Sequence, residues 1–320
     1  MFLAKKLLSV IIIIYLLFCT NPLKAEKLDV IERVKDEYGI KGEGVSIAIL
    51  DTGISENVTG LNIKSKKNFT KSSSVIDLSG HGTFMYSLIG SDKYGIAPEA
   101  DIFIGKVLER AGQGKYEDII KGIEWAANKE VDIILMSLGG REKSEKLKKA
   151  IEKAYNNDII LISAVGNDGI SERDSIRYPA KFKQVIGVGA VDNNNQRLFN
   201  SSRGNKIDIM APGHDLTGYS LNNETIRQSG TSVAAAYVAG FIALMKEYVG
   251  DRSAEEIKKS IIETAKTKSD KFNYGNGILQ EEKAITYFDK NNHLLFYITI
   301  AFVMLVITTL TIKKYKIKKL

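Results

Sequence analysis

Short apolar runs recur along the middle of the chain, and segments with helical spacing separate most of them. The apolar runs cover residues 45–50, 101–107, 131–136, 159–165 and 185–190. Continuous apolar runs of this length predict strands that are buried on both faces, as in a parallel sheet. Helical spacing predicts helices over residues 29–38, 116–129, 147–155, 232–249 and 257–264. Because strands and helices alternate, we expect an α/β fold with a doubly wound, mostly parallel sheet and helices on both faces.

The beginning of the chain has a different pattern from the middle. Residues 1–25 combine a lysine-containing start, one apolar stretch and a small residue at Ala25, which together predict a signal peptide cleaved after Ala25. An uncleaved membrane anchor is the alternative for this segment. Cys19, the only cysteine, lies within it. Once the segment is removed, the mature protein has no thiol and no disulfide.

The end of the chain carries a second hydrophobic segment. Residues 294–312 are 19 residues without a charge, and as a helix they would extend over about 28 Å, close to the thickness of a bilayer core. The lysine-rich residues 313–320 follow directly, which argues against a buried core helix. We therefore expect a single transmembrane helix with a basic cytoplasmic tail, and residues 26–290 as one extracellular domain.

The positive charge of the chain is confined to these two ends. The formal net charge is +7, and eight lysines in residues 1–25 and 313–320 account for all of it. Subtracting these eight leaves −1 for residues 26–290. A nearly neutral domain lacks the basic surface that nucleic-acid binding requires, so we expect no nucleic-acid partner. The hydrophobic segment at 294–312 leads us to expect a location at the cell membrane.

Three polar stretches interrupt the apolar pattern where a parallel sheet places its ligand sites. Asp51 ends the first apolar run, His81 opens a helix within Ser-Gly-His-Gly-Thr, and Ser232 begins another within Gly-Thr-Ser. Each alone is typical of a turn or a helix cap. Together they provide what serine catalysis requires: a hydroxyl, an imidazole base to take its proton, and a carboxylate to orient the imidazole.

Asn167 adds a fourth element, because it follows the fourth apolar run in the loop Ala-Val-Gly-Asn. An amide at this place can donate a hydrogen bond to a developing oxyanion. The chain order Asp, His, Ser is also one of the three orders in which this triad occurs. Four candidate catalytic residues that occur in this order indicate serine catalysis far more specifically than any one of them alone.

With these residues in this order, the chain from about Tyr38 to about Tyr287 resembles a subtilisin-like serine peptidase of the subtilase family. The segments at 95–108, 122–140, 185–197 and 207–213 also resemble that family. The resemblance implies that Asp51 orients His81, that His81 is the general acid and base, and that Ser232 is the nucleophile. It also implies that Asn167 and the Ser232 backbone N–H form the oxyanion hole.

The family further implies where a polypeptide substrate binds. Two segments would pair with an extended peptide, namely Ser137, Leu138 and Gly139 on one side and Gly112 and Gly114 on the other. The first segment and the stretch containing Ala164 and Gly166 would form the walls of a pocket for the side chain before the scissile bond. Arg177 falls near the floor of that pocket. If it points inward, acidic or polar side chains are favoured; the alternative is that it points to solvent.

The sequence departs from the family pattern at several places. Phe84 stands where the family usually repeats a histidine, and Ala235-Ala-Tyr237 replaces its usual Ser-Pro-His. Only about 25 residues lie between Ala25 and Asp51, so we expect no folding prodomain of the usual kind. The chemistry requires no cofactor, no metal ligand is assigned, and the structural calcium common in the family has no ligands that we can identify.

The sequence thus predicts an extracellular, membrane-anchored serine endopeptidase that forms an acyl-enzyme. Processing of a secreted peptide precursor and general surface proteolysis both fit this description. The alternative is a catalytically silent surface protein that keeps the fold and binds peptides in its groove.

Overall fold

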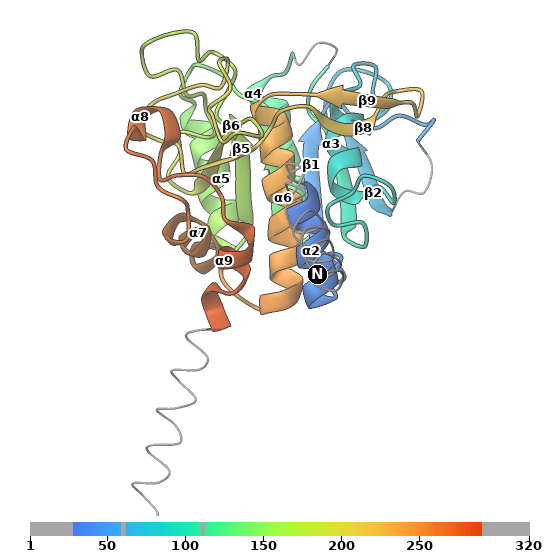
Figure 1. The fold of residues 1–320 in the computed structure, drawn as a ribbon. Coiled ribbons are helices and arrows are strands. Elements are labelled where there is room, and N and C mark those ends of the chain that lie inside the picture. Colours follow the sequence, from blue (N-terminus) through green and yellow to red (C-terminus); the bar gives the residue numbers. More distant parts are fainter. Residues whose placement is uncertain (1–27, 59–61, 110–112, 290–320) are drawn as a thin grey trace, which may run out of the picture.

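A central sheet of seven parallel strands organises the computed structural model, which describes residues 28–58, 62–109 and 113–289 (Figure 1). The strands lie in the order β2-β3-β1-β4-β5-β6-β7. Their bounds are β1 Ser46–Asp51, β2 Ile63–Asn68, β3 Asp101–Lys106, β4 Ile133–Met136, β5 Ile160–Ala164, β6 Val185–Val191 and β7 Ile209–Pro212. A separate antiparallel hairpin consists of β8 (Leu216–Tyr219) and β9 (Thr225–Gln228).

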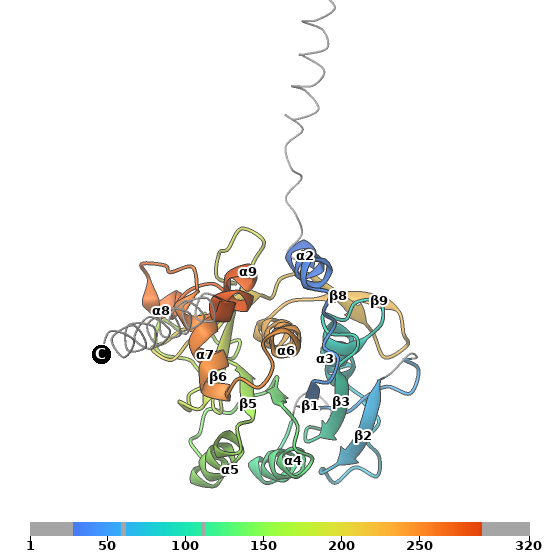
Figure 2. The same cartoon turned by 90° about the horizontal axis from the view of Figure 1, so that it is seen from below.

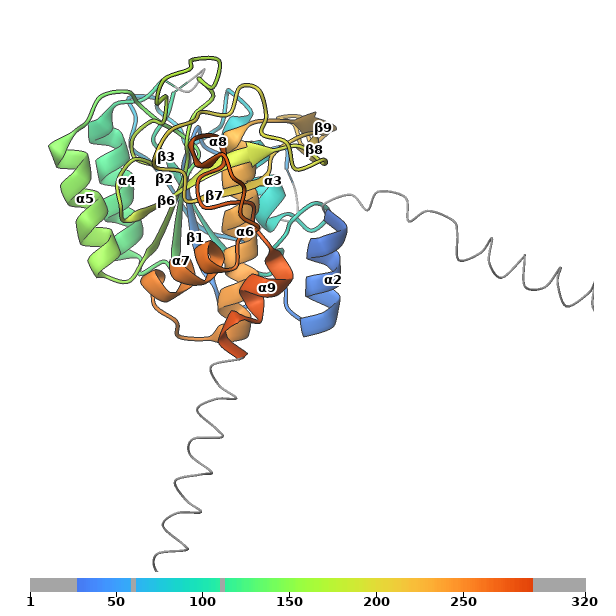
Figure 3. The same ribbon diagram turned by 60° about the vertical axis from the view of Figure 1, so that its left-hand side comes forward.

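Helices cover both faces of the sheet. Figure 2 shows α4 (Tyr116–Asn128) and α5 (Glu145–Asn156) on one face, and α3 (His81–Gly90) and α6 (Thr231–Val249) on the other. Further helices lie on the side of α3 and α6 (Figure 3), namely α2 (Leu28–Tyr38), α7 (Ala254–Glu263), α8 (Lys271–Tyr274) and α9 (Glu281–Ile285). This is the predicted α/β architecture with helices on both faces.

The side chains of β1 explain why the strands read as continuous apolar runs. Ile47 and Ile49 pack into the core beneath α3 and α6, whereas Ala48 and Leu50 pack into the core beneath α4 and α5. Successive side chains of a strand point to opposite faces of the sheet. A strand covered on both faces therefore has no solvent-facing position at which a polar residue would be favoured.

The strand order reverses between β1 and β4, and this reversal places the polar residues named above in one crevice. From β1 the chain passes to the edge strand β2, comes back to form β3 beside β1, and then crosses to the other side of β1 for β4. Asp51 ends β1, Ser137 follows β4 and Asn167 lies just beyond β5. Ligand sites of open parallel sheets lie outside the carboxyl ends of the strands at such a reversal.

All five predicted strands and the five helices predicted from their spacing are present, within a few residues of the predicted bounds. Helix α3 begins at His81, where the sequence predicted that a helix opens. Four strands and the short helices α8 and α9 were not predicted. Among them, β2 lies at the edge of the sheet and contains Lys64, Lys66 and Lys67, which give it no apolar run. Charged residues on an edge strand protect it from pairing with another chain.

Within the described part of the chain, α6 is the one helix long and apolar enough to cross a membrane, and most of it is buried in the core. The predicted signal peptide, residues 1–25, and the predicted transmembrane helix and tail, residues 294–320, lie outside the described residues.

Candidate active site

A cavity of about 380 Å³ lies at the carboxyl edge of the sheet, and it brings three of the four predicted catalytic side chains together. His81, Asn167 and Ser232 line this cavity. They come from the start of α3, the loop after β5 and the start of α6, which are far apart in sequence. The fourth, Asp51, is buried behind His81 with 1% of its surface exposed.

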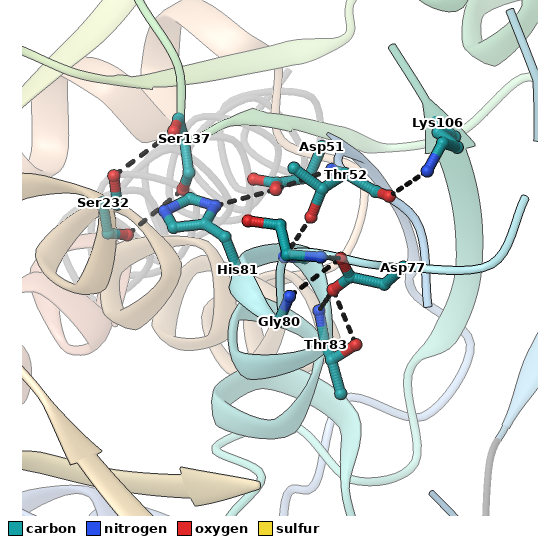
Figure 4. Close-up of polar contacts among 11 residues, drawn as sticks. Asp51, Thr52, Asp77, Gly80, His81, Thr83, Lys106, Ser137 and Ser232 are labelled. Atoms are coloured by element: carbon teal, nitrogen blue, oxygen red, sulfur yellow. Dashed lines mark hydrogen bonds and ion pairs between the residues drawn. The ribbon is translucent and has the colours of Figure 1, made fainter. Parts of the chain in front are cut away.

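Asp51 holds the imidazole of His81 in one orientation. Its Oδ1 lies 2.7 Å from His81 Nδ1 and also accepts a 2.7 Å hydrogen bond from the backbone N–H of Thr52 (Figure 4). An ionised carboxylate only accepts hydrogen bonds, so Nδ1 carries the proton in this contact. In the neutral ring the other nitrogen, Nε2, is then the acceptor. Figure 4 shows the ring lying between Asp51 and Ser232.

The charges around His81 raise its basicity. Burial lowers the pKa of the imidazole, but the charge of Asp51, its hydrogen bond and the charge of Asp77 raise it by more. The pKa therefore lies above its ordinary value of 6.5. A base of this strength is suited to accepting a proton near neutral pH.

Asp77, which the sequence did not single out, fixes the start of α3. Its Oδ1 accepts hydrogen bonds from the backbone N–H groups of Ser79 and Gly80, and its Oδ2 accepts from the N–H and hydroxyl of Thr83. A carboxylate that satisfies the free N–H groups of a helix start both caps the helix and interacts favourably with its dipole. His81 is the first residue of that helix.

Lys106 is a buried cation that joins the two segments supporting His81. Its side chain is on β3, where it is the register partner of Asp51, and the residue is 2% exposed. The ammonium donates to the carbonyl oxygen of Thr52 at 2.9 Å (Figure 4). It also donates to the carbonyl oxygen of Ile76 at 2.8 Å. Lys106 therefore connects Thr52, the residue after Asp51, to Ile76, the residue before Asp77. A lysine at the end of an apolar run was the only sequence signal for this role.

Ser232 is the second residue of α6, at the positive end of the helix dipole. Its hydroxyl donates to the carbonyl oxygen of Ser137 at 3.2 Å, and the Ser137 hydroxyl donates back to the Ser232 carbonyl at 3.1 Å. The hydroxyl thus lies in the same cavity as His81 and is bonded to the segment that follows β4.

Thr231 fixes the orientation of the Asn167 amide. The backbone N–H and the hydroxyl of Thr231 both donate to Asn167 Oδ1, each at 3.1 Å. Because an N–H can only donate, the atom facing it must be the amide oxygen, which leaves Nδ2 as the group free to donate. The residue before Thr231 is Gly230, whose φ of 141° is a backbone conformation that favours glycine. Thr231 belongs to the Gly-Thr-Ser motif, but the sequence predicted no role for it.

Most of the residues assigned to substrate binding line the same cavity. They are Ser137, Leu138, Gly139, Ala164, Gly166 and Arg177. Gly114 does not line it but pairs with Leu108, which does, and Gly112 lies outside the described residues. Ser79, Leu108, Asp168 and Thr231 also line the cavity and were not predicted.

Arg177 points into the cavity and is paired there. Its Nε donates to Asp168 Oδ2 at 2.6 Å, and its Nη1 donates to the Gly139 carbonyl oxygen at 3.2 Å. The hydrogen bond from Arg177 lowers the pKa of Asp168, against an opposing effect of burial, and the charge of Arg177 lowers it further. Of the two orientations considered for Arg177, the inward one is present.

The departures from the family pattern lie in the core behind the site. Phe84 and Tyr237 are both fully buried, one on α3 and one on α6. The Tyr237 hydroxyl donates to Glu281 of α9 at 2.7 Å. Among the described residues no group of three or more His, Cys, Asp or Glu side chains is placed to hold a metal ion, so calcium stays unassigned.

Comparison with known proteins adds an independent line of evidence. Residues 42–277 match the sequence profile of the Subtilase family. The chain is 38% identical over 253 residues to subtilisin DY from Bacillus licheniformis, an alignment covering 77% of this chain and 92% of that protein. It is 35% identical over 254 residues to subtilisin E from Bacillus subtilis, covering 77% of this chain and 67% of that protein. Among solved structures, the prenylagaramide maturation protease PagA matches with a TM-score of 0.69 and 28% identity, covering 80% of this chain and 96% of that one.

Proposed function

This chain belongs to the subtilase family and is a serine endopeptidase, and we propose that it cleaves peptide bonds through Ser232, His81 and Asp51. The observation that carries the assignment is the 2.7 Å contact between Asp51 and His81 behind a cavity that Ser232 also lines. The reaction passes through an acyl-enzyme on Ser232, which water then hydrolyses.

In this proposal the chemistry begins with a movement of one hydroxyl. Rotation about the Cα–Cβ bond of Ser232 turns its Oγ from the Ser137 carbonyl toward Nε2 of His81. Catalytic hydrogen bonds are often long or misaligned before substrate binds and tighten in the complex. His81 takes the proton as Oγ attacks the carbonyl carbon, Asp51 stabilises the imidazolium, and His81 then gives the proton to the leaving amine.

Asn167 and the backbone N–H of Ser232 are the proposed donors to the oxyanion. The two hydrogen bonds from Thr231 hold the amide so that Nδ2 is left for the cavity. A donor fixed before the reaction loses no free energy in reorienting when negative charge develops.

The peptide substrate is proposed to lie along Ser137, Leu138 and Gly139, with the segment containing Gly112 and Gly114 on its other side, as an added strand. The side chain before the scissile bond enters the cavity between Gly139 and Gly166, toward Arg177.

We also propose that the protein is anchored in the cell membrane by residues 294–312, with its catalytic domain outside the cell. The uncharged residues 294–312 and the lysines that follow them support this. Helix α6 begins with Thr231 and Ser232, which line the cavity, and ends at the bottom of Figure 1 next to α9, near the last described residue. An anchor following residue 289 would leave the cavity facing away from the bilayer. Cleavage of a secreted peptide precursor fits such a location, and PagA, a structural relative, is a maturation protease.

The test is hydrolysis of a mixed peptide library by the full chain in detergent, read by mass spectrometry. The proposal expects cleavage by the wild type, none by Ser232→Ala or His81→Ala, and folded protein in each case. Wild-type protein that binds library peptides without cutting them would support the silent binding protein instead. For the topology, protease added to intact cells should degrade the body and spare the tail at 313–320; a protected body would contradict the external location.

A further inference from the structure

The side chain of Arg177 lies between two glycines that line the cavity. A Cβ added to Gly139 would lie 2.9 Å from Arg177 Cβ, and a Cβ added to Gly166 would lie 3.1 Å from both Cγ and Cδ. These two glycines follow β4 and β5, respectively, and both line the cavity. The aliphatic part of Arg177 therefore occupies the space that side chains at these two positions would need, and its guanidinium is within reach of a substrate side chain that enters the cavity as proposed.

The charge of that guanidinium is balanced inside the cavity. Asp168 Oδ2 accepts the 2.6 Å hydrogen bond from Nε, and the side chains of Asp168 and Arg177 are only 25% and 31% exposed. A pair this sheltered is screened less by solvent than a surface pair. Arg141 lies 3.6 Å from the other Asp168 oxygen, but its side chain is 78% exposed, so its effect on the cavity is small.

The paired guanidinium still has hydrogen-bond donors to offer. A guanidinium carries five N–H groups, and two are used in the bonds to Asp168 and Gly139. An amide or hydroxyl oxygen of the substrate can accept from the others without adding charge. A substrate carboxylate could accept them too, but it would bring a second negative charge next to Asp168, and juxtaposed like charges are strongly disfavoured.

We propose that Asp168 is a specificity-determining residue that masks Arg177, so that the enzyme prefers an uncharged, hydrogen-bond-accepting side chain such as glutamine before the scissile bond over an acidic one. This inference rests on the proposed function, and it narrows the choice between acidic and polar side chains that an inward-pointing Arg177 alone leaves open.

The test uses two peptides that differ only in glutamine or glutamate before the cleaved bond, and compares their kcat/KM values for each enzyme. Both values come from the same enzyme preparation, so their ratio does not depend on the concentration of active enzyme or on a change in activity that affects both peptides equally. We expect the wild type to favour glutamine by about tenfold or more. Asp168→Asn, which keeps the shape but removes the negative charge, should move the ratio toward glutamate by at least a similar factor.

Arg141→Gln is the matched control, because it removes the exposed arginine on the other side of the same carboxylate; its ratio should stay within about twofold of the wild type. Arg177→Met gives a second test that does not depend on Asp168→Asn folding. It leaves Asp168 unmasked and removes the donors, so hydrolysis of the glutamate peptide should fall further than that of a peptide with methionine at the same position.

Three results would overturn the proposal: a wild type that prefers glutamate, an unchanged ratio in folded Asp168→Asn, or Arg177→Met that cleaves the glutamate peptide as well as the wild type does. Wild-type protein that reacts with a fluorophosphonate but cleaves neither peptide would also reject this specificity while leaving the proposed function standing. Protein that neither reacts nor cleaves would reject both.

Discussion

Replacing Thr231 with valine tests the proposed oxyanion donor, Asn167, without changing Asp51, His81 or Ser232. Valine has the shape of threonine, and residue 231 is fully buried, so the change removes the hydroxyl donor to Asn167 Oδ1 without altering the packing volume much. The 3.1 Å bond from the backbone N–H remains. Asn167 then keeps one of its two constraints, and its amide samples orientations in which Nδ2 no longer faces the oxyanion.

The expected decrease in kcat follows from the loss of one of these two hydrogen bonds. A hydrogen bond of this kind contributes about 1 kcal/mol, which corresponds to roughly a fivefold decrease in kcat. The KM should change little, because the oxyanion exists only in the transition state. Asn167→Ala should be far worse, with a loss of about 10²–10³ in kcat.

The assay is steady-state peptide hydrolysis by four proteins: wild type, Thr231→Val, Asn167→Ala and the double variant. If Thr231 acts through the amide, Thr231→Val has no effect on kcat once Asn167 is alanine. Thr231→Ser, which keeps the hydroxyl, should retain most of the wild-type kcat. Equal fold losses in both backgrounds, or a change confined to KM, would refute the reasoning.

Three further outcomes are expected. Because the pKa of His81 is raised, kcat/KM should decline as the pH falls through a midpoint above 6.5, and Asp51→Asn should move that midpoint downward; a wild-type midpoint below 6.5 would contradict this. Tyr237→Phe removes the 2.7 Å bond to buried Glu281 and should lower the free energy of unfolding in urea by about 1–3 kcal/mol with kcat/KM unchanged. Glu247 accepts three hydrogen bonds from the backbone N–H groups of residues 41–43, so Glu247→Gln should lower the melting temperature, by the equivalent of about 1–2 kcal/mol, and leave the cavity unaffected.

The parts of the fold that could be predicted from the sequence are those buried on both faces. Residues 47–50 of the strand that ends at Asp51 are all apolar because two helical layers cover it. The edge strand β2 could not be predicted in the same way, since Lys64, Lys66 and Lys67 face solvent and the strand has no periodic apolar signal. The ends of the predicted elements carried the candidate chemistry, because that is where a parallel sheet exposes its loops.

The candidate site was predicted residue by residue, but not the contacts that hold it. Asp51, His81 and Ser232 lie in recognisable short motifs. Thr231 is 64 residues from the amide that it orients, and Lys106 is 54 residues from the carbonyl oxygen of Thr52 that it binds. Such supports depend on tertiary packing, and no local pattern marks them.

Reaction of the full-length wild type with a fluorophosphonate, followed by peptide mapping in a mass spectrometer, tests most directly whether the hydroxyl at the start of α6 is an activated nucleophile. The account predicts one covalent adduct, on Ser232, formed quickly in the wild type and abolished by His81→Ala. A folded wild type that gains no adduct, or an adduct on a different residue, would contradict it.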